Sequence, residues 1–213
     1  MFLMIEINQI VNEPVSSNCF VVFDKAVGNF CIVVDPGSNN NSTLLNYLNS
    51  NDLVPQFIIL THEHFDHCWG VNELREQYKD VKLLCSKICS IAIQDMKKNY
   101  SVFFEQPGFA IDAADIELSD ASHSMKWNGQ ILEFKPAKGH SSSGIFLKID
   151  KYLFTGDELI KDFKTVTKLK TGSKEKLKES IRYLKSMKGE SLKVCPGHGN
   201  CFLLDNYELE LLM

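Results

Sequence analysis

The sequence predicts an α/β fold in which two β-sheets pack together and are covered by helices. Two groups of short apolar runs predict the sheets, one group in each half of the chain, and helix-like segments lie between and after the runs. No linker, low-complexity tract or short-period repeat interrupts the pattern. With 213 residues and 44% apolar content, the chain is expected to form one domain over residues 1–213.

In the first half, apolar runs at residues 2–10, 19–23 and 30–34 are separated by turn residues and predict a β-meander. Asp35-Pro36-Gly37 ends the third run, and a helix is expected over residues 42–48. The continuous apolar run at 57–60 is typical of a strand buried on both faces. Two more helices are expected at 71–79 and 87–97, with a strand at 81–84 between them.

The second half repeats this organisation. Strands are expected at residues 131–134, 145–149, 152–154 and 192–195. Residues 173–187 predict an amphipathic helix, because apolar residues recur there at spacings of four and three. Ser173 is a suitable N-cap for this helix, and Gly189 is a suitable stop after it.

The charge and the N-terminal sequence exclude several function classes. The net charge is −4, so the chain has no basic footprint for nucleic acid. Residues 1–5 are apolar without a basic segment, which predicts a strand and not a signal peptide. No stretch approaches the roughly 20 apolar residues of a membrane span. We therefore expect a cytoplasmic protein with neither a nucleic-acid nor a membrane partner.

Seven cysteines, an odd number in a chain without an export signal, argue against a disulfide framework. Their spacings also differ from the C-x-x-C pattern of structural zinc sites. We expect most of the thiols to pack as small buried hydrophobes. Cys68, which directly follows the cluster described next, is expected to do the same despite its position.

Four potential metal ligands fall within six residues, directly after the apolar run at 57–60: His62, His64, Asp66 and His67. Loops at the carboxyl ends of buried strands are where sites form in α/β proteins. Residues two apart on an extended segment point the same way, so His62 and His64 can share one metal. Asp66 and His67 follow a turn and can reach a second metal. Imidazole and carboxylate ligands suit zinc, iron or manganese.

This cluster and four further motifs resemble the metallo-β-lactamase superfamily, and within it the hydroxyacylglutathione hydrolase (glyoxalase II)-like branch. The motifs occur in the family's order: D-P-G at 35–37, H-x-H-x-D-H at 62–67, G-H-S at 139–141, T-G-D at 155–157 and P-G-H-G at 196–199. The resemblance covers essentially the whole chain. It implies a four-layer αββα sandwich with two mixed β-sheets covered by helices.

The resemblance also implies two divalent metal ions, with zinc expected and iron or manganese as alternatives. The first ion would be bound by His62, His64 and His140, and the second by Asp66, His67 and His198, with Asp157 bridging the two. Asp35 would hydrogen-bond beside the ligands without binding metal itself.

Such a centre would carry a net positive charge, because two divalent ions outweigh the carboxylates of Asp66 and Asp157. This favours a small anionic substrate. A metal-bound hydroxide would attack a thioester or related ester, and Asp66 would orient this nucleophile and help to move its proton. The expected activity is that of a glyoxalase II-like metallohydrolase.

The sequence departs from the family pattern in two places. Lys138 precedes His140 where the family usually reads P-G-H-T. A lysine in a turn is usually solvated, and the alternative is that Lys138 contacts an anionic substrate. No counterpart of the C-terminal helical extension of longer thioester hydrolases follows His198, so glutathione specificity is not carried over. The apolar segment 202–213 is expected to pack on the core, with a homodimer contact as the alternative.

Several alternatives stay open at this point. A mononuclear iron persulfide dioxygenase would use the equivalents of His62, His140 and Asp157. A flavodiiron oxidoreductase is disfavoured, because these enzymes usually have Glu where His64 stands. Phosphodiester cleavage is disfavoured by the acidic net charge. A non-catalytic relative would be expected to have lost ligands, and none is lost here. Lactone hydrolysis is a further alternative, and β-lactam hydrolysis is disfavoured by Asp157. The aromatic loop 99–108 would form either core or a lid.

Overall fold

The computed structural model describes residues 5–212 and divides into two compact units, Met1–Leu118 and Ser119–Met213. Each unit is built on one six-stranded sheet. Both sheets are mixed and both carry helices, which confirms the fold class predicted from the sequence. That the whole chain acts as one domain stays a prediction.

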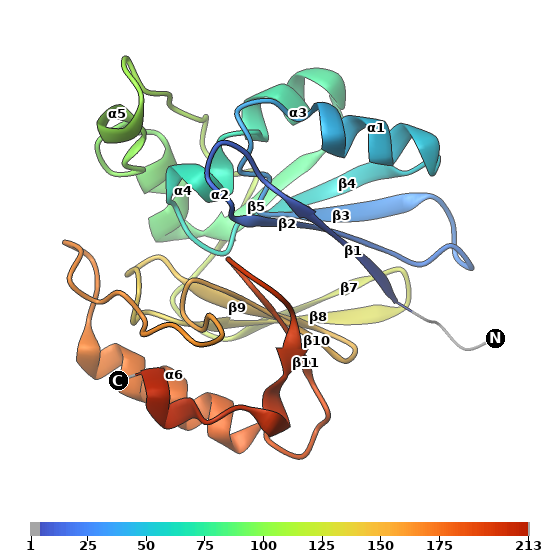
Figure 1. Cartoon of the computed structure of the whole chain (residues 1–213). Helices are drawn as coiled ribbons and strands as arrows, with labels where there is room; N and C mark the ends of the chain where they lie inside the picture. Colours follow the sequence, from blue (N-terminus) through green and yellow to red (C-terminus); the bar gives the residue numbers. More distant parts are fainter. Residues whose placement is uncertain (1–4, 213) are drawn as a thin grey trace. The chain divides into compact units, whose positions relative to one another are not determined.

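The sheet of the first unit has the strand order β1-β2-β3-β4-β5-β6. The first three strands pair antiparallel, and β3 to β6 pair parallel (Figure 1). Parallel pairing aligns the carboxyl ends of β3, β4 and β5 at one edge, where the loops after them can carry a site. The strands are β1 Glu6–Val11, β2 Asn18–Phe23, β3 Phe30–Val34, β4 Val54–Ile59, β5 Lys82–Ser86 and β6 Ile116–Leu118.

Helices α1, α3 and α4 cover one face of this sheet. Leu48 of α1, Leu74 of α3 and Ile93 of α4 share one apolar cluster with strand residues such as Val33 and Ile58. Figure 1 shows α1 and α3 lying over the same strands. The helices of this unit are α1 Ser42–Ser50, α2 Phe65–Cys68, α3 Val71–Gln77, α4 Lys87–Ile93 and α5 Ser101–Phe104.

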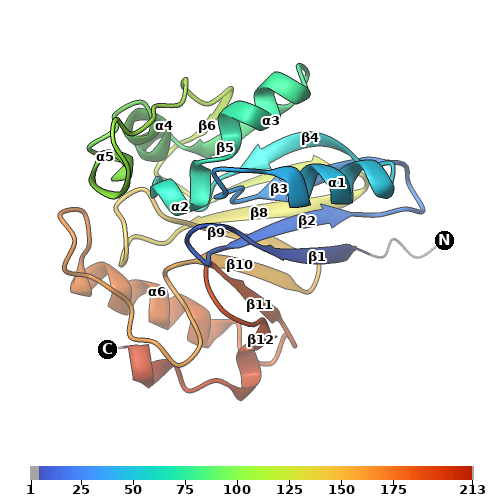
Figure 2. The same ribbon diagram turned by 45° about the horizontal axis from the view of Figure 1, so that its top comes forward.

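The sheet of the second unit has the order β12-β11-β10-β9-β8-β7, in which only β10 and β11 pair parallel (Figure 2). Helix α6, Lys174–Ser186, packs Leu177, Ile181 and Leu184 against it. Ser173 caps α6 as expected, since its side chain accepts a hydrogen bond from the backbone of Lys176. The strands are β7 His123–Trp127, β8 Gln130–Pro136, β9 Ile145–Ile149, β10 Tyr152–Gly156, β11 Lys193–Pro196 and β12 Phe202–Leu203.

The structure corrects several predicted boundaries. The helix expected over 87–97 ends at Ile93, and α5 lies within the loop expected at 99–108. Strands β6, β7 and β12 were not predicted. The first strand begins at Glu6, while residues 2–4 of its predicted range lie outside the described residues.

The C-terminal segment packs as expected. Leu204, Tyr207 and Leu209 are buried and belong to the same apolar cluster as α6. Core packing therefore accounts for these three apolar side chains. Among residues 5–212, no helix has the length and hydropathy needed to cross a membrane.

Gly37 is a position where a side chain does not fit. A Cβ there would lie 1.6 Å from the carbonyl oxygen of Asp66 and 2.8 Å from Nδ2 of Asn12. We therefore expect Gly37→Ala to lower the free energy of unfolding by about 2–3 kcal/mol, measured by urea titration. Gly28→Ala is the matched control, because no atom lies within 4 Å of its added Cβ and only its φ of 153° costs energy, about 1 kcal/mol. Equal losses in the two variants would contradict the steric argument.

Candidate metal centre

Asp35, the residue after β3, organises the loop that follows β4. Its Oδ1 accepts from the backbone N–H of Thr61 at 2.7 Å, and its Oδ2 accepts from the Thr61 hydroxyl at 2.6 Å. The same Oδ2 lies 3.1 Å from Nδ1 of His67. Asp35 is 2% exposed, and its backbone has a left-handed φ of 51°. Asp35 therefore occupies a hydrogen-bonding position beneath the histidine loop.

The hydrogen bond to Asp35 orients the ring of His67. Since the carboxylate accepts at Nδ1, that nitrogen carries the proton and Nε2 is the atom suited to bind a metal. Nε2 lies 3.6 Å from Oδ2 of Asp66, the neighbouring residue in α2. A buried imidazole and a carboxylate oxygen thus face a common point.

The hydroxyl of Thr61 orients the ring of His62. No role was predicted for Thr61 from the sequence. Its single hydroxyl proton is donated to Asp35, so its oxygen accepts from Nδ1 of His62 at 3.0 Å. This leaves Nε2 of His62 as the nitrogen that is able to bind a metal. The ring centroids of His62 and His64 are 4.6 Å apart, and those of His62 and His67 are 4.3 Å apart. We call His62, His64, Asp66 and His67 the first ligand set.

Backbone contacts hold the short helix that carries Asp66 and His67. The backbone N–H of Phe65 donates to the carbonyl of Asn99 at 2.8 Å, and the Ser17 hydroxyl donates to the carbonyl of Asp66. Cys68 is buried, and its thiol donates to the carbonyl of Glu63 at 3.4 Å. Burial, together with the nearby carboxylates of Asp66 and Asp35, raises the pKa of the Cys68 thiol well above its usual value. Cys68 is therefore a packed thiol, as expected.

The second unit contains a candidate ligand set of its own, formed by His140, Asp157 and His198. Oδ2 of Asp157 lies 3.6 Å from Nε2 of His140 and 3.6 Å from Nε2 of His198. Asp157 comes directly after β10, and His198 lies in the turn that follows β11, the parallel neighbour of β10. The T-G-D and P-G-H-G motifs thus meet at one edge of the sheet. We call these three residues the second ligand set.

Glu158 and Val166 hold His140 in position. Neither residue was identified from the sequence. Glu158 is buried, and its carboxylate accepts from the backbone N–H groups of Gly139 at 2.9 Å and His140 at 2.7 Å. The carbonyl of Val166 lies 3.0 Å from Nδ1 of His140 and accepts its proton, which leaves Nε2 to face Asp157. The only sequence signal for Glu158 is its place beside Asp157.

The donor atoms fit a divalent transition metal. A distance of 3.6 Å is too long for a hydrogen bond between an imidazole nitrogen and a carboxylate oxygen. It is close to the roughly 3.4 Å that separates two ligand atoms bound tetrahedrally at about 2.1 Å from zinc. Both sets combine imidazole with carboxylate, and the rings of His62, His67 and His140 each have a hydrogen-bonding partner on Nδ1. Such outer partners are typical of metal sites.

Lys138 is engaged within its own unit. Its ammonium group pairs with Asp120, and both residues line a cavity of about 480 Å³ with Lys176, Arg182 and Tyr183. The lysine side chain is 20% exposed. A contact with substrate would therefore compete with the Asp120 pair.

Glu158→Ala is expected to leave two buried N–H donors without an acceptor. The free energy of unfolding should fall by about 2–3 kcal/mol, as measured by urea titration. Zinc affinity should fall as well, because the His140 loop loses its support, and Glu158→Gln should recover part of it. Glu133→Ala, on the exposed face of β8, is the control and should change neither quantity. Unchanged zinc affinity in Glu158→Ala would contradict the positioning role.

Comparison with known proteins identifies relatives along most of the chain. The model of the metallo-beta-lactamase superfamily matches residues 12–198. An uncharacterised protein of Mycobacterium tuberculosis (strain ATCC 25618 / H37Rv) is 27% identical over 198 residues, covering 86% of each chain. A hydroxyacylglutathione hydrolase of Pectobacterium atrosepticum is 24% identical over 186 residues, which cover 87% of this chain but 64% of the hydrolase.

Solved structures show the same fold. The BLEG-1 B3 metallo-beta-lactamase superposes with a TM-score of 0.85 at 24% identity, covering 93% of this chain and 94% of that one. TTHA1623, solved in a di-iron-bound form, superposes with a TM-score of 0.76 at 22% identity, covering 92% and 94%. The superfamily match spans both ligand sets and all five sequence motifs except the last residue of P-G-H-G. The chain belongs to the metallo-beta-lactamase superfamily.

Proposed function

We propose that this protein is a metal-dependent hydrolase that acts on a small anionic thioester or related ester in the cytoplasm. The observation that carries the proposal is the pair of candidate ligand sets, in which imidazole nitrogen and carboxylate oxygen atoms lie 3.6 Å apart. That the two sets serve one centre with two ions rests on the family membership and on the order of the motifs.

In this proposal three histidines would hold one ion, two histidines and a carboxylate would hold the other, and Asp157 would contribute to both. Zinc is the expected metal, with iron or manganese as alternatives. When bound, the ions supply Lewis acidity and lower the pKa of coordinated water to about 7. The first three histidines are His62, His64 and His140, and the second group is Asp66, His67 and His198.

The protein side of the reaction centres on Asp66 and the rings around it. Asp66 lies beside His67, and its backbone carbonyl accepts from Ser17. In this proposal its carboxylate orients a water molecule and helps to move its proton. The hydrogen bonds of His62 and His67 hold a proton on Nδ1 of each ring, so that Nε2 stays unprotonated and able to bind a metal. Asp35 accepts the Nδ1 proton of His67 directly and reaches His62 through the Thr61 hydroxyl, so one carboxylate orients both neutral rings.

An aromatic group beside His64 supports a substrate with an apolar part. The ring of Tyr100 stands edge-on to His64 with centroids 4.9 Å apart, and Phe104 stacks on Phe65 at 4.7 Å. Phe104 is 50% exposed despite this stacking. The exposure of Phe104 supports an apolar wall beside His64, the arrangement that a lid over this histidine would need.

Metal content and substrate range test the proposal together. Protein purified without added metal should contain two zinc or manganese ions per chain and should hydrolyse thioesters in a panel that also holds lactones and phosphodiesters. Removing the metal with a chelator should abolish hydrolysis, and zinc should restore it. One iron per chain with oxygen consumption on persulfides would instead indicate the dioxygenase alternative. Sedimentation of the same sample would show whether a homodimer forms.

Lys138→Ala separates a substrate contact from a structural ion pair. If the ammonium group contacts an anionic substrate, the Michaelis constant for anionic thioesters should rise about tenfold, since a charge-assisted hydrogen bond contributes about 1.5 kcal/mol or more. Neutral esters should be unaffected. Asp120→Ala, which removes only the partner of Lys138, is the control. An unchanged Michaelis constant for both substrate classes would exclude the contact.

A further inference from the structure

Two cysteines frame the turn that carries His198. Strands β11 and β12 pair antiparallel, with Lys193 opposite Leu203 and Val194 opposite Phe202. The same register brings Cys195 opposite Cys201, at the two ends of the turn. Their sulfur atoms are 3.8 Å apart. Facing positions in an antiparallel pair have the Cα and Cβ separations that a disulfide requires.

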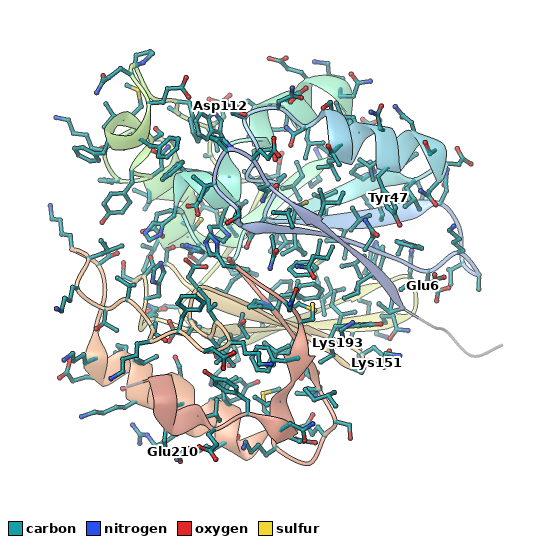
Figure 3. All side chains as sticks on the ribbon, viewed as in Figure 1. Glu6, Tyr47, Asp112, Lys151, Lys193 and Glu210 are labelled. Atoms are coloured by element: carbon teal, nitrogen blue, oxygen red, sulfur yellow. The ribbon has the colours of Figure 1, made fainter. Side chains whose placement is uncertain are left out.

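Cys201 is also the accessible thiol of the chain. All seven cysteines lie in the described residues, and the six others are buried, with exposures of 0% or 1%. The hydrogen bond with Cys195 lowers the pKa of Cys201, and Lys193, which Figure 3 labels on β11, adds to the effect. Burial raises the pKa of Cys195. The accessible sulfur is thus the one with more thiolate character, and a second thiol lies behind it.

We propose that Cys195 and Cys201 are a reversible redox site that forms a disulfide by exchange with small organic disulfides. The Cys201 thiolate attacks one sulfur of the small disulfide, whose S–S bond breaks and releases one thiolate that takes up a proton. Cys195 then loses its proton and attacks the Cys201 sulfur of the mixed disulfide, releasing the second small thiol. Two cysteine thiols are oxidised, and one disulfide is reduced to two thiols.

Formation of the disulfide requires only a small movement, and the turn is the part of the chain that moves. The sulfur atoms must approach from 3.8 Å to about 2.05 Å. Cys195 is held in β11 between β10 and β12, whereas Cys201 lies just before the two-residue strand β12. Closure therefore draws Cys201 toward Cys195 and joins the two ends of the turn that contains His198. This places a redox-sensitive bond at the base of the turn that carries a proposed ligand.

A second close pair provides an internal control. Cys85 and Cys89 also form a side-chain hydrogen bond, but both are 0% exposed. If proximity alone were enough, this pair would oxidise as well. If an accessible first thiol is required, as we propose, it stays reduced.

Thiol trapping tests the site without using enzyme activity. Folded, metal-loaded protein is incubated with hydroxyethyl disulfide, unfolded, alkylated with N-ethylmaleimide and cut with trypsin. Cleavage after Lys193 yields one peptide, beginning at Val194, that contains both cysteines and none of the other five. This peptide is expected to carry no alkyl group and to weigh two hydrogens less, while the other five cysteines are alkylated. Dithiothreitol should restore double alkylation.

Two variants complete the test. Cys195→Ser should stop at the mixed disulfide on Cys201, and Cys201→Ser should not react. A doubly alkylated peptide, or a persistent mixed disulfide in the unsubstituted protein, would overturn the proposal. Because the readout is a peptide mass, its failure leaves the hydrolase proposal intact, and failure of hydrolysis leaves the redox site intact.

Discussion

Replacing Asp157 with asparagine is expected to lower kcat/KM by about 10³-fold or more and to reduce metal content in the same preparation. Asp157 is the carboxylate common to both histidines of the second ligand set, with Oδ2 3.6 Å from Nε2 of His140 and of His198. Asparagine keeps the shape of the side chain and removes its charge. Two imidazoles would then lose the anion that offsets a divalent ion between them.

Metal content should be measured by mass spectrometry on dialysed protein, and hydrolysis on the best thioester of the panel. Glu179→Gln removes a charge from the exposed surface of α6 in the same unit and serves as the control. Thermal unfolding checks that Asp157→Asn is folded. Full metal content with lost activity would exclude Asp157 as a ligand, and normal activity would exclude the bridging role altogether.

Asp35→Ala is expected to lower the free energy of unfolding by about 3–5 kcal/mol and to weaken zinc binding by about 10- to 100-fold. The buried carboxylate accepts from the backbone and hydroxyl of Thr61 and from the ring of His67. Its removal leaves three buried hydrogen-bond donors without this acceptor. The His67 ring also loses the partner that holds its proton on Nδ1.

The left-handed backbone of Asp35 requires its own control. Asp52 is exposed and has nearly the same geometry, with φ of 54° against 51° for Asp35, so Asp52→Ala measures the backbone cost without the hydrogen bonds. Urea titration of the two variants should give a loss for Asp35→Ala that exceeds the loss for Asp52→Ala by about 2 kcal/mol or more. Similar losses would mean that the carboxylate contributes little.

The local pattern of apolar residues was enough to predict the helices and strands that bury side chains at regular spacings. Helix α6 begins after Ser173 and ends before Met187 as its apolar spacing predicts, and strands β9 and β10 cover the predicted runs. The apolar pattern was not enough to predict strands that form because they pair with a neighbouring strand. Strand β7 has few apolar residues and is held by its register against β8, and β12 has two residues that pair with β11.

The early end of α4 has a tertiary cause as well. The carbonyl of Ile93 accepts from the backbone N–H of Ile111 at 3.0 Å and from the side chain of Asn99 at 3.4 Å. Both donors come from a later segment that returns to the helix end. A periodic sequence does not show which of its carbonyls a distant residue will engage, so the helix was predicted four residues too long.

The sequence by itself determined the family, the two mixed sheets and the candidate ligand residues, because strand ends and five short motifs are local features. The tertiary structure alone decided how those ligands are held. Glu158 is 18 residues from His140, and the Val166 carbonyl is 26 residues from it, yet both fix its orientation. Hydrogen bonds between such distant groups depend on the completed fold and leave no periodic trace along the chain. The alignment of Cys195 with Cys201 has the same origin, since only the register of β11 against β12 brings the two sulfur atoms together.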